Sequence, residues 1–156
     1  MMEQLDELYR TVILEHFKHS PHAGELPKAQ VHAAGNNPLC GDDVAFDIQL
    51  TKDHIDQVRF RGKGCAISQA ASSMLAESLE GKTLPQARQL IETLKGLMQG
   101  KEPDPSVDLG DLEALAGVRK FPVRVKCAAL SWNVVEQGLD EYVQHREQKT
   151  EVRGQN

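Results

Sequence analysis

The stretch from Asp43 to Thr51 alternates between apolar and polar residues, and this pattern constrains the fold more than any other feature of the sequence. Its apolar residues share one face of an extended chain: Val44, Phe46, Ile48 and Leu50. The alternation predicts a half-buried strand, with Asp43 and the other polar residues facing solvent. A turn over 52–56 and a second run from Gln57 to Arg61 predict a hairpin, so we expect an antiparallel sheet.

Apolar residues at helical spacing occur both before and after this hairpin. This spacing predicts helices over 5–19, 65–80, 84–98 (with Thr83 as N-cap) and 123–146. The stretch 20–38 has no period and is predicted to be a loop, and 147–156 is predicted to fray. We therefore expect an α+β fold, in which helices pack on one face of a small antiparallel sheet.

The length and charge of the chain limit its class. A chain of 156 residues is expected to form a single domain (1–156), with a mostly irregular acidic insertion at about 100–117 that holds a short helical piece near 112–116. The net charge of −5 and the lack of a basic patch argue against a nucleic-acid binder. The apolar runs are too short for a membrane span and no signal peptide is visible, so we expect a cytoplasmic protein.

Three cysteines stand far apart, each beside glycine, aspartate or basic residues. They lie in Asn-Pro-Leu-Cys-Gly-Asp (37–42), Gly-Lys-Gly-Cys (62–65) and Arg-Val-Lys-Cys (124–127). If the strand continues back to Cys40, then Cys40 and Asp42 point to the face that the helices cover. Cys65 and Cys127 are expected near helix starts, where the helix dipole favours thiolates. An odd number of cysteines argues against a disulfide framework.

Three thiolates and the Asp42 carboxylate form a four-ligand set that suits tetrahedral zinc. Arg124 and Lys126 would offset the negative charge of such a cluster, and an aspartate ligand indicates a site that can open. The residue types alone leave inert, buried cysteines as an equal alternative. The histidines offer no ligand beside a cysteine, and those at 16, 19 and 22 are expected to be solvated at the end of the first helix.

The order of the three motifs resembles the U-type iron–sulfur cluster assembly proteins, the IscU/NifU-like family, over about residues 5–144. IscU-type scaffolds carry a histidine immediately before the third cysteine, where this chain has Lys126. The 62-residue separation of Cys65 and Cys127, which includes the 100–117 insertion, also exceeds that of the scaffolds. Both departures resemble the SufU branch.

That resemblance implies an IscU/SufU-like fold and a zinc-dependent sulfurtransferase. Zinc would be held by Cys40, Asp42, Cys65 and Cys127, and Cys40 would accept persulfide sulfur from a SufS-type cysteine desulfurase. Arg124 would act at the partner interface or balance charge, and the sulfur would pass to a SufBCD-type cluster assembly complex. Two alternatives stay open: a scaffold that assembles a [2Fe–2S] cluster on the cysteines, and a structural zinc domain that only mediates protein contacts.

Overall fold

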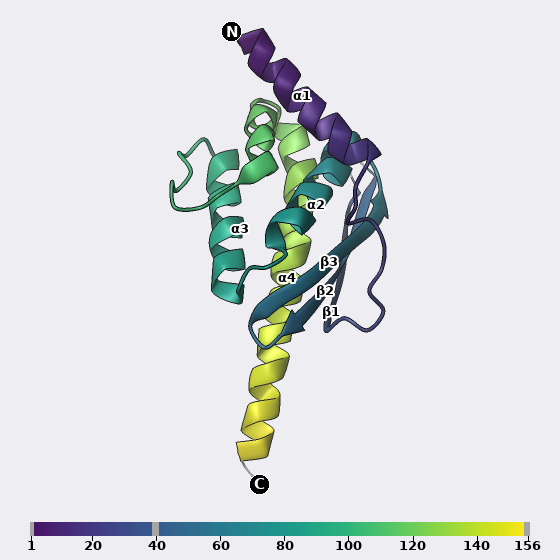
Figure 1. The fold of residues 1–156 in the computed structure, drawn as a ribbon, viewed down its shortest axis with the longest axis vertical. Helices are drawn as coiled ribbons and strands as arrows, with labels where there is room; N and C mark the ends of the chain where they lie inside the picture. Colours follow the sequence, from purple (N-terminus) through teal and green to yellow (C-terminus); the bar gives the residue numbers. More distant parts are fainter. Residues whose placement is uncertain (1, 39–40, 155–156) are drawn as a thin grey trace.

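The computed structural model of the protein describes residues 2–38 and 41–154, with side chains for residues 7, 9–38 and 41–147. Figure 1 shows its elements in chain order. They are α1 (Met2–Lys18), β1 (Val31–Asn37), β2 (Asp42–Thr51), β3 (His54–Lys63), α2 (Ala66–Leu79), α3 (Leu84–Met98), the 3₁₀ helix η1 (Gly110–Lys120) and α4 (Pro122–Gly154). None of these described helices is both long and apolar enough to cross a membrane.

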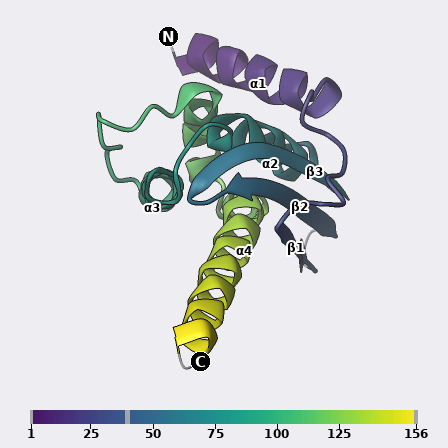
Figure 2. The same cartoon turned by 60° about the horizontal axis from the view of Figure 1, so that its bottom comes forward.

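The sheet of the described chain has the order β1-β2-β3, and both strand pairs are antiparallel. Helices α2 and α4 pack against one face of it, and α1 lies across α2 (Figures 1 and 2). The apolar residues of the alternating stretch, Phe46 and Ile48 among them, are fully buried beneath these helices. The predicted α+β fold, with helices on one face of an antiparallel sheet, is therefore confirmed.

Strand β1 was not predicted, and the interpretation of 20–38 as a loop is wrong for its last third. Val31 is followed only by small or polar residues, which have weak strand propensity and show no alternation of apolar side chains. The strand forms because the edge of β2 offers hydrogen-bond partners. Gly35 also permits close packing on α4, since a Cβ there would come within 2.7 Å of the Val134 side chain.

The predicted boundaries of the hairpin and the last helix also need correction. The turn is shorter than 52–56, because β3 already begins at His54. Helix α4 continues to Gly154, so the prediction that 147–156 frays is wrong for the residues that the structure describes. Its last turns extend beyond the sheet (Figure 1), where strong helix formers such as Glu147 and Lys149 carry the helix on.

Helix η1 occupies 110–120, a longer span than the predicted helical piece at 112–116. Its buried residues Leu112, Leu115 and Val118 are three apart. A spacing of three matches the three residues per turn of a 3₁₀ helix and not the 3.6 of an α-helix. For this reason the α-helical period of the sequence predicts only part of the element.

Asp47 lies on the predicted polar face of β2, yet only 2% of it is exposed. The segment 20–30 crosses this face, and the backbone N–H of Leu26 donates to Asp47 Oδ2 at 2.8 Å. Arg61 donates to the same oxygen at 2.9 Å, and His32 Nδ1 lies 2.7 Å from Oδ1. Burial raises the pKa of Asp47, but these hydrogen bonds outweigh burial and hold the pKa below 3.8.

Candidate metal centre

The register of the hairpin brings Asp42 beside Cys65. In the β2–β3 pair Asp43 lies opposite Lys63, so the start of β2 meets the end of β3, where the chain turns into α2. The Cys65 backbone N–H donates to Asp42 Oδ1 at 2.8 Å, and the Cys65 Sγ lies 3.8 Å from Asp42 Oδ2. Asp42 is completely buried, as the predicted strand parity requires.

Gly64 makes this approach possible. It adopts φ +147°, and a Cβ there would lie 2.1 Å from Asp42 Oδ1. Gly62 is equally restricted, with φ +155° and a hypothetical Cβ 2.0 Å from the Asp43 carbonyl oxygen. The Gly-Lys-Gly sequence before Cys65 is therefore required by the contact between β2 and the start of α2.

Cys65 is the N-cap residue of α2, as the sequence predicted for a cysteine at a helix start. The Ser68 backbone N–H donates to Cys65 Sγ at 3.4 Å. The positive end of the helix dipole therefore faces the sulfur, and this favours negative charge on it. The residue is only half-buried, so its sulfur remains within reach of a ligand.

Cys127 comes to the same place from α4. It lies in the second turn of that helix, near the helix start as predicted, and only 3% of it is exposed. Its thiol donates to the Val123 carbonyl oxygen at 3.6 Å, across one helical turn. The helix starts at Pro122, whose fixed φ suits a first helical position, directly after η1.

The ligand atoms of Asp42, Cys65 and Cys127 all lie within 4.8 Å of one another. Around a tetrahedral zinc ion, Zn–S bonds of about 2.3 Å and Zn–O bonds of about 2.0 Å place ligand atoms about 3.5–3.8 Å apart. The observed 3.8 Å between the Cys65 sulfur and the Asp42 oxygen is about 0.3 Å longer than the sulfur–oxygen spacing of about 3.5 Å, so a small side-chain movement would complete the geometry. One carboxylate and two soft sulfur donors fit zinc, and the same set would also accept ferrous iron.

The other predicted site residues lie either outside the described part of the chain or on its surface. Cys40 lies outside the described residues, so its assignment as ligand and sulfur acceptor stays a prediction. Arg124 and Lys126 are exposed on the first turns of α4, close in sequence to the buried Cys127. Asp43 is exposed, as predicted.

Sequence reasoning missed a groove beside these residues. Its cavity has a volume of about 630 Å³ and opens between α1, η1 and the starts of α2 and α4. Arg124 and Phe121 line it, and Phe121 is 57% exposed. The available signal in the sequence was the aromatic residue itself, directly before the proline that opens the last predicted helix.

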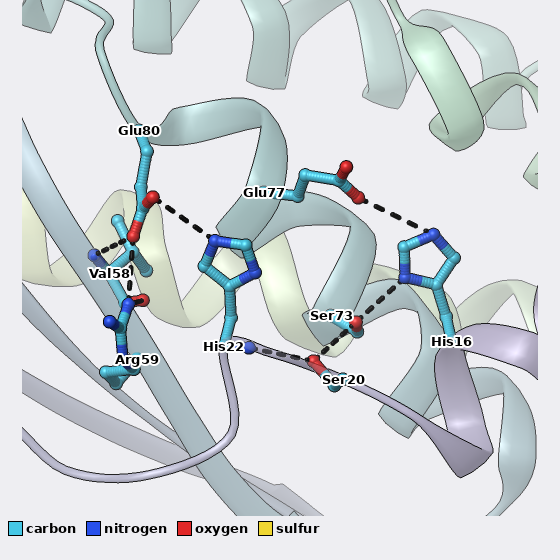
Figure 3. A network of polar contacts seen from close by, with 8 residues as sticks. All are labelled: His16, Ser20, His22, Val58, Arg59, Ser73, Glu77 and Glu80. Carbon is cyan, nitrogen blue, oxygen red and sulfur yellow. Dashed lines mark hydrogen bonds and ion pairs between the residues drawn. The ribbon is translucent and has the colours of Figure 1, made fainter.

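Two histidines that were predicted to be solvated are instead part of a polar network (Figure 3). His16 Nδ1 contacts Ser73, and the His22 Nε2 contacts the Glu80 carboxylate at 3.2 Å. The His22 Nδ1 is buried with no hydrogen-bond partner among the described residues. The prediction is therefore wrong for His16 and His22, although it holds for the exposed His19. His16 stands three residues after the buried Ile13, and this spacing could have indicated its inward orientation.

Comparison with known proteins decides the family. A family model described as the NifU-like N-terminal domain matches residues 8–128, which include the three converging side chains. The chain belongs to this family. The predicted resemblance to the IscU/NifU-like proteins is thereby confirmed.

Among NifU-like relatives, the zinc-dependent sulfurtransferase SufU of Bacillus subtilis is 44% identical over 135 residues, covering 86% of this chain and 91% of the relative. The iron–sulfur cluster assembly scaffold protein IscU of Streptococcus pyogenes is 36% identical, covering 88% of this chain and 86% of that protein. A crystal structure from Fervidobacterium islandicum, described as a SUF-system iron–sulfur cluster assembly scaffold protein (FiSufU), superposes with a TM-score of 0.78. It is 35% identical and covers 82% of this chain and 93% of its own.

Proposed function

We propose that this protein is a zinc-dependent sulfurtransferase in iron–sulfur cluster assembly. It accepts persulfide sulfur from a SufS-type cysteine desulfurase and passes it to a SufBCD-type assembly complex, in the cytoplasm. The observation that carries the proposal is the convergence of Asp42, Cys65 and Cys127 in a NifU-like domain. The 44% identity to a protein named as a zinc-dependent sulfurtransferase supports the transfer role over other roles in the family.

Zinc would be held by Asp42, Cys65, Cys127 and Cys40. Cys40 is two residues from Asp42, which limits their Cα separation to about 7 Å, and this closeness in the chain supports Cys40 as the fourth ligand. When bound, zinc would keep the thiols deprotonated and protect them from oxidation. The buried hydrogen bond from the Cys65 N–H fixes one oxygen of Asp42 and leaves the other directed toward the Cys65 sulfur.

Cys40 is the proposed sulfur acceptor. Its thiolate attacks the outer sulfur of the desulfurase persulfide and forms a new S–S bond. The old S–S bond breaks and its electron pair leaves on the desulfurase cysteine as a thiolate, so no external oxidant or reductant is needed. The exposed Arg124 and Lys126 contribute positive charge at the rim of the site, where a persulfide anion would approach. Arg124 also lines the groove with Phe121, which we assign to contact with the desulfurase.

A [2Fe–2S] scaffold is the second candidate, because the Streptococcus pyogenes relative carries the IscU scaffold name. Lysine at position 126 argues against it. A lysine ammonium has no lone pair for a metal, unlike the histidine of IscU-type scaffolds. The third candidate, a structural zinc domain, predicts that ligand substitutions alter stability without affecting sulfur transfer.

The test combines metal analysis with a desulfurase assay. Protein purified without added metal should contain about one zinc per chain and no iron. Cys40→Ala should lose acceptance of labelled persulfide sulfur while its circular dichroism spectrum stays native. For the ligand set, Asp42→Ala should lose zinc, and Asp43→Ala is the matched control because Asp43 is the exposed neighbour.

Zinc removal should also destabilise the protein. At a free zinc concentration 1,000 times the dissociation constant, binding contributes about 4 kcal/mol, which corresponds to a fall in Tm of roughly 8–16 °C on chelation. Stoichiometric iron and sulfide would establish the scaffold function instead. Full sulfur acceptance by Cys40→Ala would overturn the sulfurtransferase mechanism.

A further inference from the structure

A second group of potential metal ligands lies away from the cysteines, where three elements meet. His16 comes from α1, Glu77 from α2 and Asp111 from η1, and their ligand atoms all lie within 4.8 Å of one another. The His16 Nε2 is 2.8 Å from Asp111 Oδ2 and 3.6 Å from Glu77 Oε2. Figure 3 shows the histidine and Glu77 directed toward each other, with the ring held between α1 and α2.

The other ring nitrogen of His16 has a fixed partner. The Ser73 hydroxyl donates to the Ser20 hydroxyl oxygen at 2.7 Å, so the Ser73 oxygen is left to accept a hydrogen bond. The His16 Nδ1 lies 2.8 Å from this oxygen. With Nδ1–H donating to Ser73, the lone pair of a neutral ring lies on Nε2, as in metal-binding histidines whose second nitrogen donates to a neighbouring acceptor.

That lone pair faces two carboxylates, and lone pairs directed at carboxylate oxygens repel. A cation at Nε2 removes the repulsion. The cation is either a proton, which hydrogen-bonds to the partly exposed Asp111 carboxylate at 2.8 Å, or a metal ion. We propose that His16, Glu77 and Asp111 bind a divalent first-row cation of the Mn²⁺, Fe²⁺ and Zn²⁺ class.

The dimensions and chemistry of the cluster fit such an ion. Metal–ligand bonds of about 2.0–2.1 Å place neighbouring ligands about 2.9 Å apart in octahedral and 3.3 Å apart in tetrahedral coordination. The observed 2.8 and 3.6 Å bracket these values. Imidazole and carboxylate donors suit Mn²⁺ and Fe²⁺, and two carboxylates neutralise a divalent charge.

The site is partly open to solvent. The His16 side chain is only 10% exposed, which orients the ring, while the Glu77 and Asp111 side chains are each 55% exposed. Water can therefore complete the coordination, and the ion can exchange. An open site with three protein ligands is expected to bind more weakly than the thiolate site.

The two sites are separate. Glu77 lies twelve residues beyond Cys65 along α2, which corresponds to about 18 Å at 1.5 Å per residue. The second site would instead tie α1 and η1 to α2, and η1 leads directly into the start of α4 that carries Cys127. This inference does not depend on the proposed sulfur-transfer activity.

Manganese binding tests the proposal. Zinc-loaded protein is titrated with Mn²⁺, and free Mn²⁺ is measured by electron paramagnetic resonance. Mn²⁺ prefers nitrogen and oxygen ligands, so it does not compete for the occupied thiolate site. Wild type should bind one Mn²⁺ per chain. Asp111→Asn should weaken binding by at least about tenfold, and Glu113→Gln, an exposed carboxylate of the same helix, should leave it unchanged.

A measurement on the wild-type protein covers the case in which Asp111→Asn fails to fold. The ring nitrogens of ¹⁵N-labelled His16 are followed by NMR as Zn²⁺ is added beyond the first equivalent. The Nε2 resonance should shift while Nδ1 keeps its proton. If Mn²⁺ binds wild type and Asp111→Asn equally weakly, or the His16 resonances do not change, the cluster is an ion pair only and the proposal is wrong.

Discussion

Substitution of Gly64 by alanine tests how the site is built. At φ +147° a residue with a side chain costs about 1–3 kcal/mol in backbone strain. The new Cβ would lie 2.1 Å from Asp42 Oδ1, so the carboxylate must move away. Movement breaks the 2.8 Å hydrogen bond from the Cys65 N–H, and a hydrogen bond to a charged group contributes about 1.5–3 kcal/mol. We expect Gly64→Ala to lower the free energy of unfolding by about 2.5–6 kcal/mol.

Gly81→Ala is the matched control. Gly81 also has positive φ, +86°, but nothing lies within 4 Å of its hypothetical Cβ. It follows α2 at the end opposite Cys65. Its substitution should cost only the strain of a left-handed residue, about 1–2 kcal/mol, and leave zinc affinity unchanged.

Urea unfolding of the zinc-free proteins measures the free energy of unfolding. Competition with a chromophoric chelator measures zinc affinity. Gly64→Ala should bind zinc at least about tenfold more weakly, because the displaced carboxylate no longer faces the sulfurs. If Gly64→Ala is no less stable than Gly81→Ala and retains wild-type zinc affinity, the contact between Gly64 and Asp42 does not shape the site.

Two further predictions concern the sheet and α3. The pKa of Asp47 is held below 3.8 in the folded protein, so its stabilisation is complete above the unfolded pKa and is lost as the pH falls through the lower, folded value. Asp47→Asn should therefore lower the free energy of unfolding, measured in urea, by about 1.5–3 kcal/mol at neutral pH and by progressively less below pH 3.8. A loss of stability that does not depend on pH would contradict the pairing of Asp47 with His32 and Arg61. Thr83→Ala should cost about 1 kcal/mol by removing the capping box with Gln86, and Thr83→Ser should restore most of it; equal urea midpoints for all three proteins would show that the cap contributes nothing.

The elements that sequence predicted well are those with a strong local period. Strand β2 carries a buried apolar residue at every second position from Val44 to Leu50, and helices α2 and α3 carry apolar stripes and N-cap residues. Strand β1 has no such pattern, because its hydrogen bonds come from β2 and its close contact with α4 depends on Gly35. The alternation of β2 also predicts a solvated Asp47, because nothing near this residue in the sequence indicates that segment 20–30 covers it.

The sequence by itself determined which chemistry is available: soft thiols at 65 and 127, a carboxylate at 42, and glycines where a side chain could not fit. These follow from residue identity and from period two along β2, which already directs Asp42 inward. Tertiary structure decided which groups meet. The antiparallel register joins Asp42 to Cys65, and packing of α4 adds Cys127 from 62 residues further along the chain. It also joins His16, Glu77 and Asp111, because contacts between distant segments depend on how whole elements pack and leave no local period to detect.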